Sequence, residues 1–138
     1  QDYAPVYYSL GLVYTRLGNY PQAESAFAKA LELDKASPEY RWALGLTYYQ
    51  EMNIQKAIEY LESAYSISKD PKIALELGII SRKAGEYGKA LKYLDIAVKS
   101  FPDDPAPLEN IALVYENQGL YNFAKEYWQK ALKLENMA

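Results

Sequence analysis

Residues 7–30 read YYSLGLVYTRLGNYPQAESAFAKA, and the spacing of small and large apolar residues in this stretch recurs along the whole chain. Gly11 lies 12 residues before Ala23, which is followed by Phe27 and Ala30. Counterparts of Gly11 follow at spacings of 34, 33 and 34 residues, at Gly45, Gly78 and Ala112. Self-similarity at this period predicts a stack of hairpins, each made of two helices.

Helical periodicity supports the same interpretation within each hairpin. The spacing i, i+3, i+4, i+7 is typical of a buried helix face, and it is met by Tyr7, Leu10, Gly11, Tyr14 and Leu17. Residues 18–21 then combine a glycine stop, a polar cap and a proline suited to a first helical turn. We expect eight helices, at about residues 4–17, 21–33, 38–51, 54–67, 71–84, 87–100, 105–118 and 121–134.

The small residues predict close contact between the two helices of a hairpin. Each residue at the Gly11 position is followed 12 residues later by an alanine, at Ala23, Ala57, Ala90 and Ala124. Large apolar residues follow these alanines and would fill the space beside them, at Phe27, Leu61, Leu94 and Trp128.

This pattern resembles the tetratricopeptide repeat (TPR), a family of helical hairpins with a 34-residue period. The first repeat carries the signature at Tyr7, Leu10, Gly11, Tyr14, Gly18, Tyr20, Ala23, Phe27 and Ala30. The resemblance implies one all-α domain over residues 1–138, a right-handed superhelical solenoid of four antiparallel helix hairpins, with repeats at about 4–37, 38–70, 71–104 and 105–138. Departures are Arg41 and Ala74 at the first aromatic position and Ser81 in place of the usual tyrosine.

In this family the first helices of successive hairpins line a concave groove that holds a peptide or a short helix of a partner protein. The matching positions predict a groove that is mostly apolar and aromatic, with charge beside it, as is typical of binding hot spots. The predicted groove residues are Tyr8, Leu12, Arg16, Trp42, Leu46, Tyr49, Leu75, Ile79, Arg82, Lys83, Asn110 and Leu113. The alternative for Trp42 and Tyr49 is that they pack against neighbouring helices.

The composition argues against an enzyme. The chain has no histidine and no cysteine, so the commonest general base and the soft metal ligands are absent. Asp103 and Asp104 are better explained as helix caps than as cation ligands. We therefore expect no catalysis, no cofactor and no metal site.

A protein or peptide is the expected partner. The net charge of -3 gives no basic groove for nucleic acid, and the apolar runs are too short for membrane insertion. We do not expect binding of an acidic chaperone tail, which the family holds with basic and amide side chains. The matching positions are Tyr8, Leu12, Ala43, Lys72 and Glu76, of which Lys72 fits and Glu76 would repel a carboxylate. The sequence indicates no compartment.

The end of the chain suggests an alternative function. Terminal repeats normally need a polar outer face, yet we expect Phe123, Trp128 and Leu132 in the last hairpin to be partly exposed. The chain also begins at Gln1 rather than at methionine. The alternative is a self-assembling structural scaffold, either a segment of a longer array or a homo-oligomer that associates through its C-terminal hairpin, its ends or its convex face.

Overall fold

The computed structural model describes residues 3–137, and every regular element within this range is an α-helix. The helices are α1 (Ala4–Arg16), α2 (Tyr20–Leu33), α3 (Pro38–Gln50), α4 (Ile54–Ser68), α5 (Pro71–Lys83), α6 (Tyr87–Ser100), α7 (Ala106–Asn117) and α8 (Tyr121–Met137). These bounds lie within a few residues of the expected ones. The all-α class and the helical hairpins are therefore confirmed.

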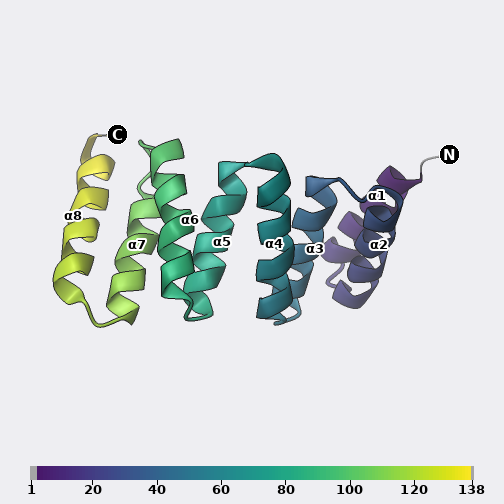
Figure 1. The fold of residues 1–138 in the computed structure, drawn as a ribbon, viewed down its shortest axis with the longest axis horizontal. Helices are drawn as coiled ribbons and strands as arrows, with labels where there is room; N and C mark the ends of the chain where they lie inside the picture. The colour runs from purple at the N-terminus through teal and green to yellow at the C-terminus, as the bar shows by residue number, and fades with distance from the viewer. Residues whose placement is uncertain (1–2, 138) are drawn as a thin grey trace. The chain divides into compact units, whose positions relative to one another are not determined.

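Helices that follow one another pair as hairpins (Figure 1), and the hairpins form two compact units. Unit 1 is Gln1–Lys69 and contains α1–α4, and unit 2 is Asp70–Ala138 and contains α5–α8. Within unit 1, α2 also contacts α3, and within unit 2, α6 contacts α7. Each unit is thus two hairpins joined by a seam between the second helix of one and the first helix of the next. The assignment of one domain to the whole chain stays a prediction.

The turn inside a hairpin has a recurring backbone geometry. Gly18 has a φ of 76°, and the amide of Asn19 donates a hydrogen bond to the carbonyl of Tyr14 at 2.9 Å. Met52 takes the same place in the second hairpin with a φ of 65°, in the left-handed region that side chains seldom adopt. The amide of Asn53 then donates to the carbonyl of Tyr48, also at 2.9 Å. The sequence Met52–Asn53 therefore folds as the glycine turns do.

The two helices of a hairpin meet at the repeated glycine. A Cβ atom placed on Gly11 would lie 2.4 Å from Cε1 of Phe27, and one on Gly78 would lie 2.5 Å from Cγ of Leu94. Phe27 and Leu94 are buried, so neither side chain has free space into which it can move. The close approach expected from the small residues is confirmed at these positions.

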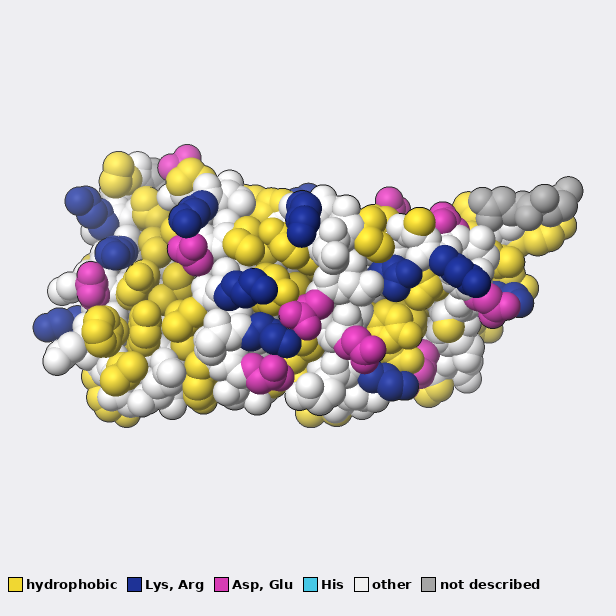
Figure 2. Space-filling model, viewed as in Figure 1, with side chains coloured by type: hydrophobic (Ala, Val, Ile, Leu, Met, Phe, Trp, Pro, Cys, Tyr) yellow, Lys and Arg dark blue, Asp and Glu magenta, His cyan; other side chains and the backbone are white. Residues whose placement is uncertain are grey.

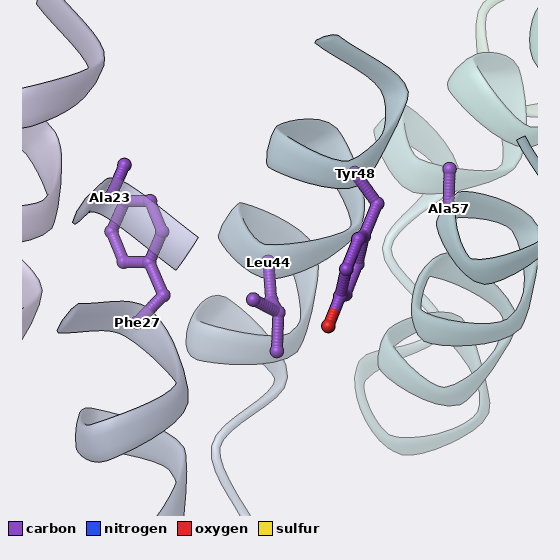
Figure 3. Close-up of a cluster of buried hydrophobic side chains, with 5 residues drawn as sticks. All are labelled: Ala23, Phe27, Leu44, Tyr48 and Ala57. Atoms are coloured by element: carbon purple, nitrogen blue, oxygen red, sulfur yellow. The ribbon is translucent and has the colours of Figure 1, made fainter. Parts of the chain in front are cut away.

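The core of unit 1 lies in the seam between α2 and α3. Figure 3 shows one cluster of buried side chains in this core, formed by Ala23, Phe27, Leu44, Tyr48 and Ala57. Tyr8 joins them from α1, with its ring centroid 5.7 Å from that of Phe27 and 5.1 Å from that of Tyr40. Aromatic rings at these separations attract one another beyond the burial of their surface.

Arg41 shows how the second repeat tolerates a departure from the family pattern. Its Nη1 donates a hydrogen bond to Oγ of Ser63 at 3.0 Å, and its Nη2 donates to the carbonyl oxygen of Lys35. The guanidinium group therefore ties α3 to α4 and to the loop before α3. Hydrogen bonds of Arg41 hold the hairpin here, at the position where the family pattern has an aromatic ring.

One prediction about the core is wrong. Leu10 and Leu17 were assigned to a buried face of α1, but their side chains are 43% and 65% exposed. Leu44, which corresponds to Leu10, is buried by the contact of α3 with α2. Within the described part of unit 1, no helix lies on the matching side of α1. The partial exposure expected for Phe123, Trp128 and Leu132 is confirmed.

We expect Gly78→Ala to be less stable than Gly88→Ala by about 1–3 kcal/mol, because a methyl group at residue 78 would overpack against Leu94. Gly88 is the matched control, since it is also helical and a Cβ atom there would meet nothing within 4 Å. Urea unfolding followed by circular dichroism measures both variants. Equal stability of the two would show that the contact at Gly78 does not constrain the hairpin.

Candidate functional site

A hollow of about 440 Å³ opens on unit 1 and is lined mainly by α1 and α3. We call it the unit 1 hollow. Its lining residues are Tyr8, Leu12, Thr15, Phe27, Glu39, Trp42, Ala43, Leu46, Thr47 and Gln50. Most of these side chains are apolar or aromatic, which is typical of a site that buries part of a ligand.

Two pairs of large side chains form the walls. Tyr8 and Leu12 lie one turn apart on α1, and Trp42 and Leu46 lie one turn apart on α3. Side chains spaced by four residues share one helix face. Phe27 reaches the hollow from α2, although its side chain is almost entirely buried. Its ring therefore serves both the core and the floor of the hollow.

The hydroxyl groups in the lining are already bonded within their own helices. Thr15 Oγ1 donates to the carbonyl of Gly11 at 2.9 Å, and Thr47 Oγ1 donates to the carbonyl of Ala43 at 2.8 Å. The exposed polar residues of the lining are Glu39 in the first turn of α3 and Gln50 at its last residue. They lie eleven positions apart on the helix, which corresponds to about 16 Å along its axis. This distance matches about five residues of extended peptide.

The structure brings four of the predicted groove residues together in the unit 1 hollow, namely Tyr8, Leu12, Trp42 and Leu46. Arg16 is exposed at the end of α1, outside the lining. Tyr49 is partly buried and packs against the core cluster of α2 and α3.

Sequence reasoning missed the contributions of Phe27 and Thr47 to the hollow. Phe27 was assigned to the core, and it does belong there. The signal for its second role is Gly11, because the absent side chain leaves room for the ring between α1 and α2.

The other six predicted groove residues lie on unit 2. Arg82 donates from Nη1 to Oδ1 of Asn117 at 3.2 Å, and Asn110 donates from Nδ2 to the carbonyl of Ala106 at 2.9 Å. Leu75 packs against the core of α6 and α7. Ile79 and Leu113 are half-buried, and Lys83 is exposed. Their role in binding stays a prediction.

Electrostatic strain in unit 1 lies in the α2–α3 seam. Burial raises the pKa of the Glu51 carboxyl group, and the neighbouring Glu24 raises it further through a hydrogen bond and its charge. Burial and the same Glu24 also raise the pKa of Tyr48. Oε1 of Glu51 is buried without a hydrogen-bond partner among the described residues. The surroundings of the seam therefore disfavour the charged form of the Glu51 carboxyl group.

Comparison with known proteins identifies the fold. Sequence models of the tetratricopeptide repeat match residues 2–70 and residues 75–135. The chain belongs to the tetratricopeptide repeat family. The TPR chain also matches the crystal structure of MamA with a TM-score of 0.91 and 26% sequence identity, over 99% of this chain and 80% of that one.

Two curated relatives of the TPR chain are named as assembly proteins. The type IV pilus assembly protein PilF of Pseudomonas aeruginosa is 31% identical over 131 residues, which cover 93% of this chain and 52% of PilF. The photosystem I assembly protein Ycf3 of Rippkaea orientalis is 33% identical over 112 residues, which cover 63% of this chain and 65% of Ycf3. The match thus spans between half and two thirds of each relative. These relatives support a role in protein–protein interaction or assembly.

None of the helices within residues 3–137 combines the length and the apolar character that crossing a membrane requires.

We expect Glu51→Gln to raise the free energy of unfolding at pH 7, because it removes a carboxyl group whose charged form is disfavoured by burial and by Glu24. The pKa of Glu51 is higher in the folded than in the unfolded state, so the folded chain binds the proton more tightly. Its unfavourable charge is fully present above the folded-state pKa and disappears below the unfolded value of about 4.3. The advantage of the variant should therefore shrink as the pH falls.

Urea unfolding at several pH values measures this difference. Glu59→Gln, at an exposed position of α4, is the control for loss of a surface charge. A Glu51→Gln variant that is less stable than the wild type at pH 7 would contradict the assignment.

Proposed function

We propose that the TPR chain is a non-catalytic protein-binding module, and that the unit 1 hollow holds a short segment of a partner protein through apolar side chains. The observation that carries the proposal is the convergence of Tyr8, Leu12, Trp42 and Leu46 on one hollow. Large aromatic and aliphatic residues around a shared depression are the usual source of binding energy at a protein interface.

The absence of reactive groups in the hollow supports a binding role. The two threonine hydroxyls of the lining donate to backbone carbonyls of their own helices, at Gly11 and Ala43. The whole chain lacks histidine and cysteine, so no imidazole can activate either hydroxyl as a nucleophile. A site with satisfied hydroxyls and apolar walls binds a ligand without reacting with it.

The polar ends of the hollow suggest how the partner is oriented. Glu39 and Gln50 stand near opposite ends of α3, about 16 Å apart along the helix. A carboxylate at one end favours a basic side chain or free N–H groups of the partner. An amide at the other end can donate to and accept from a peptide backbone. We propose a partner segment of about five residues, apolar in the middle and basic at the end near Glu39.

An assembly role fits this mode of binding. PilF and Ycf3 are named as assembly proteins, and an adaptor that grips a short segment of another protein can act in an assembly pathway without chemistry of its own.

We expect Trp42→Ala to weaken binding of such a segment by about 2 kcal/mol or more, the loss that follows removal of a hot-spot aromatic side chain. A library of short synthetic peptides with apolar centres is screened first, and the selected peptides are then titrated calorimetrically. Trp128→Phe gives a chain with Trp42 as its single tryptophan, so that fluorescence reports on the hollow directly.

Phe123→Ala is the matched control, because Phe123 is a half-exposed aromatic residue of α8 outside the unit 1 hollow. Circular dichroism shows whether each variant keeps its helices. Peptides that bind a folded Trp42→Ala variant as tightly as they bind the wild type would remove the hollow from the proposal.

A further inference from the structure

α1 carries an apolar stripe that faces away from the unit 1 hollow. We call it the α1 stripe, and its residues are Tyr3, Val6, Leu10, Val13 and Leu17. They repeat at alternating spacings of three and four residues, the pattern that lines a seam with a second helix. Val6 and Val13 are 63% and 53% exposed. An exposed seam of this kind marks a surface that another helix can cover.

The same positions are buried where a helix does cover them. In α3, Tyr40 and Leu44 correspond to Val6 and Leu10, and they lie buried in the contact with α2. In α7, Ile111 and Val114 correspond to Leu10 and Val13, and both are buried where α6 packs on α7. In both units, this helix face thus receives the second helix of the preceding hairpin.

The complementary surface is exposed on α8. A hollow of about 360 Å³ there is lined by Glu116, Tyr121, Ala124, Lys125, Trp128, Gln129 and Leu132, and we call it the α8 face. Trp128 and Leu132 are 37% and 57% exposed, and Figure 2 shows hydrophobic side chains gathered over this last hairpin. Trp128 corresponds to Phe27 of α2, which lies buried in the contact with α3. The α8 face is therefore the kind of surface onto which an α3-like helix packs.

We propose that the α8 face of one copy of this chain binds the α1 stripe of a second copy, in the register in which α2 binds α3. In this register Trp128 takes the place of Phe27, and Leu10 takes the place of Leu44, which shares a buried cluster with Phe27. This contact would remove the α1 stripe of one copy and the α8 face of the other from solvent.

Charge also favours this contact. The α2–α3 seam places Glu24 beside Glu51, and burial together with this proximity raises the pKa of Glu51. The corresponding residues of the proposed contact are Lys125 and Leu17. The contact between copies therefore lacks this carboxylate pair, and the aliphatic stem of Lys125 can lie along Leu17.

The two surfaces differ, so the contact is heterologous. Each copy has one α1 stripe and one α8 face, so two copies joined by one such contact retain one surface of each kind for a further copy or for closure of a ring. Larger species should therefore form as the protein concentration rises. A symmetric pairing through two α8 faces would instead stop at the dimer.

Paired variants that block one surface at a time test the proposal. Val13→Lys with Leu17→Lys charges the α1 stripe at exposed positions near the end of α1, where cations are compatible with the helix dipole. Gln129→Lys with Leu132→Lys charges the α8 face at exposed positions. Leu33→Lys with Ile67→Lys replaces two exposed aliphatic residues outside both surfaces and is the control. The readout is molar mass by light scattering and sedimentation over a range of concentrations.

The expected result is that the wild type and the control associate with increasing concentration. Each surface variant alone should associate at least about 30-fold more weakly than the wild type. An equimolar mixture of the two surface variants should form pairs of two chains and nothing larger, because each supplies the surface that the other lacks. A wild type that stays a single chain at the highest concentration would overturn the proposal. So would a mixture that does not pair, or a surface variant that associates as the wild type does.

Discussion

The structure depends on contact between the two helices of a hairpin at a residue that has no side chain. At Gly11 and Gly78 an added Cβ atom would lie 2.4 and 2.5 Å from the opposite side chain. Two carbon atoms come this close only when both are bonded to the same third atom. The opposing Phe27 and Leu94 are buried and cannot withdraw. The contact of the glycine backbone with the opposing side chain therefore sets the distance between the two helices of a hairpin. The seams between neighbouring hairpins form between helix pairs whose spacing is fixed by this contact.

The same contact links the fold to the candidate site. Because Gly11 leaves room, the ring of Phe27 passes between α1 and α2 and lines the unit 1 hollow while it stays in the core. Tyr8 lies against this ring with its centroid 5.7 Å away. The floor of the hollow is thus fixed by the packing that stabilises the hairpin. Because this floor is already ordered in the free protein, the protein would lose less conformational entropy on binding a partner segment.

Much of the fold could be predicted from the sequence because glycine, alanine and the large apolar residues recur in one register. The helix bounds and the close contact at Gly11 follow from that spacing. The surroundings of each helix cannot be predicted from that spacing, since periodicity identifies an apolar face but not the element that packs against it. Leu10 and Leu44 occupy equivalent positions, yet one is exposed and the other buried.

The candidate site was predictable to a smaller extent, for the same physical reason. Tyr8 and Trp42 were assigned to the groove from equivalent positions, and both line the unit 1 hollow. Tyr49 was assigned on the same grounds, but it packs against the core cluster. The bonds of Arg41 to Ser63 could not be derived from spacing either, because they join residues on two different helices.

The two proposed contacts of α1 use different faces of the helix and are therefore compatible. Successive residues of a helix are rotated by about 100°, which puts Gly11 toward α2 and sets Tyr8 and Leu12 roughly opposite the α1 stripe. A segment held in the unit 1 hollow would therefore leave Val6 and Val13 uncovered, and a second copy on the α1 stripe would leave Trp42 accessible. Stacked copies would each keep a hollow, so linked partner segments could engage several of them, with the gain in avidity that multivalent attachment gives.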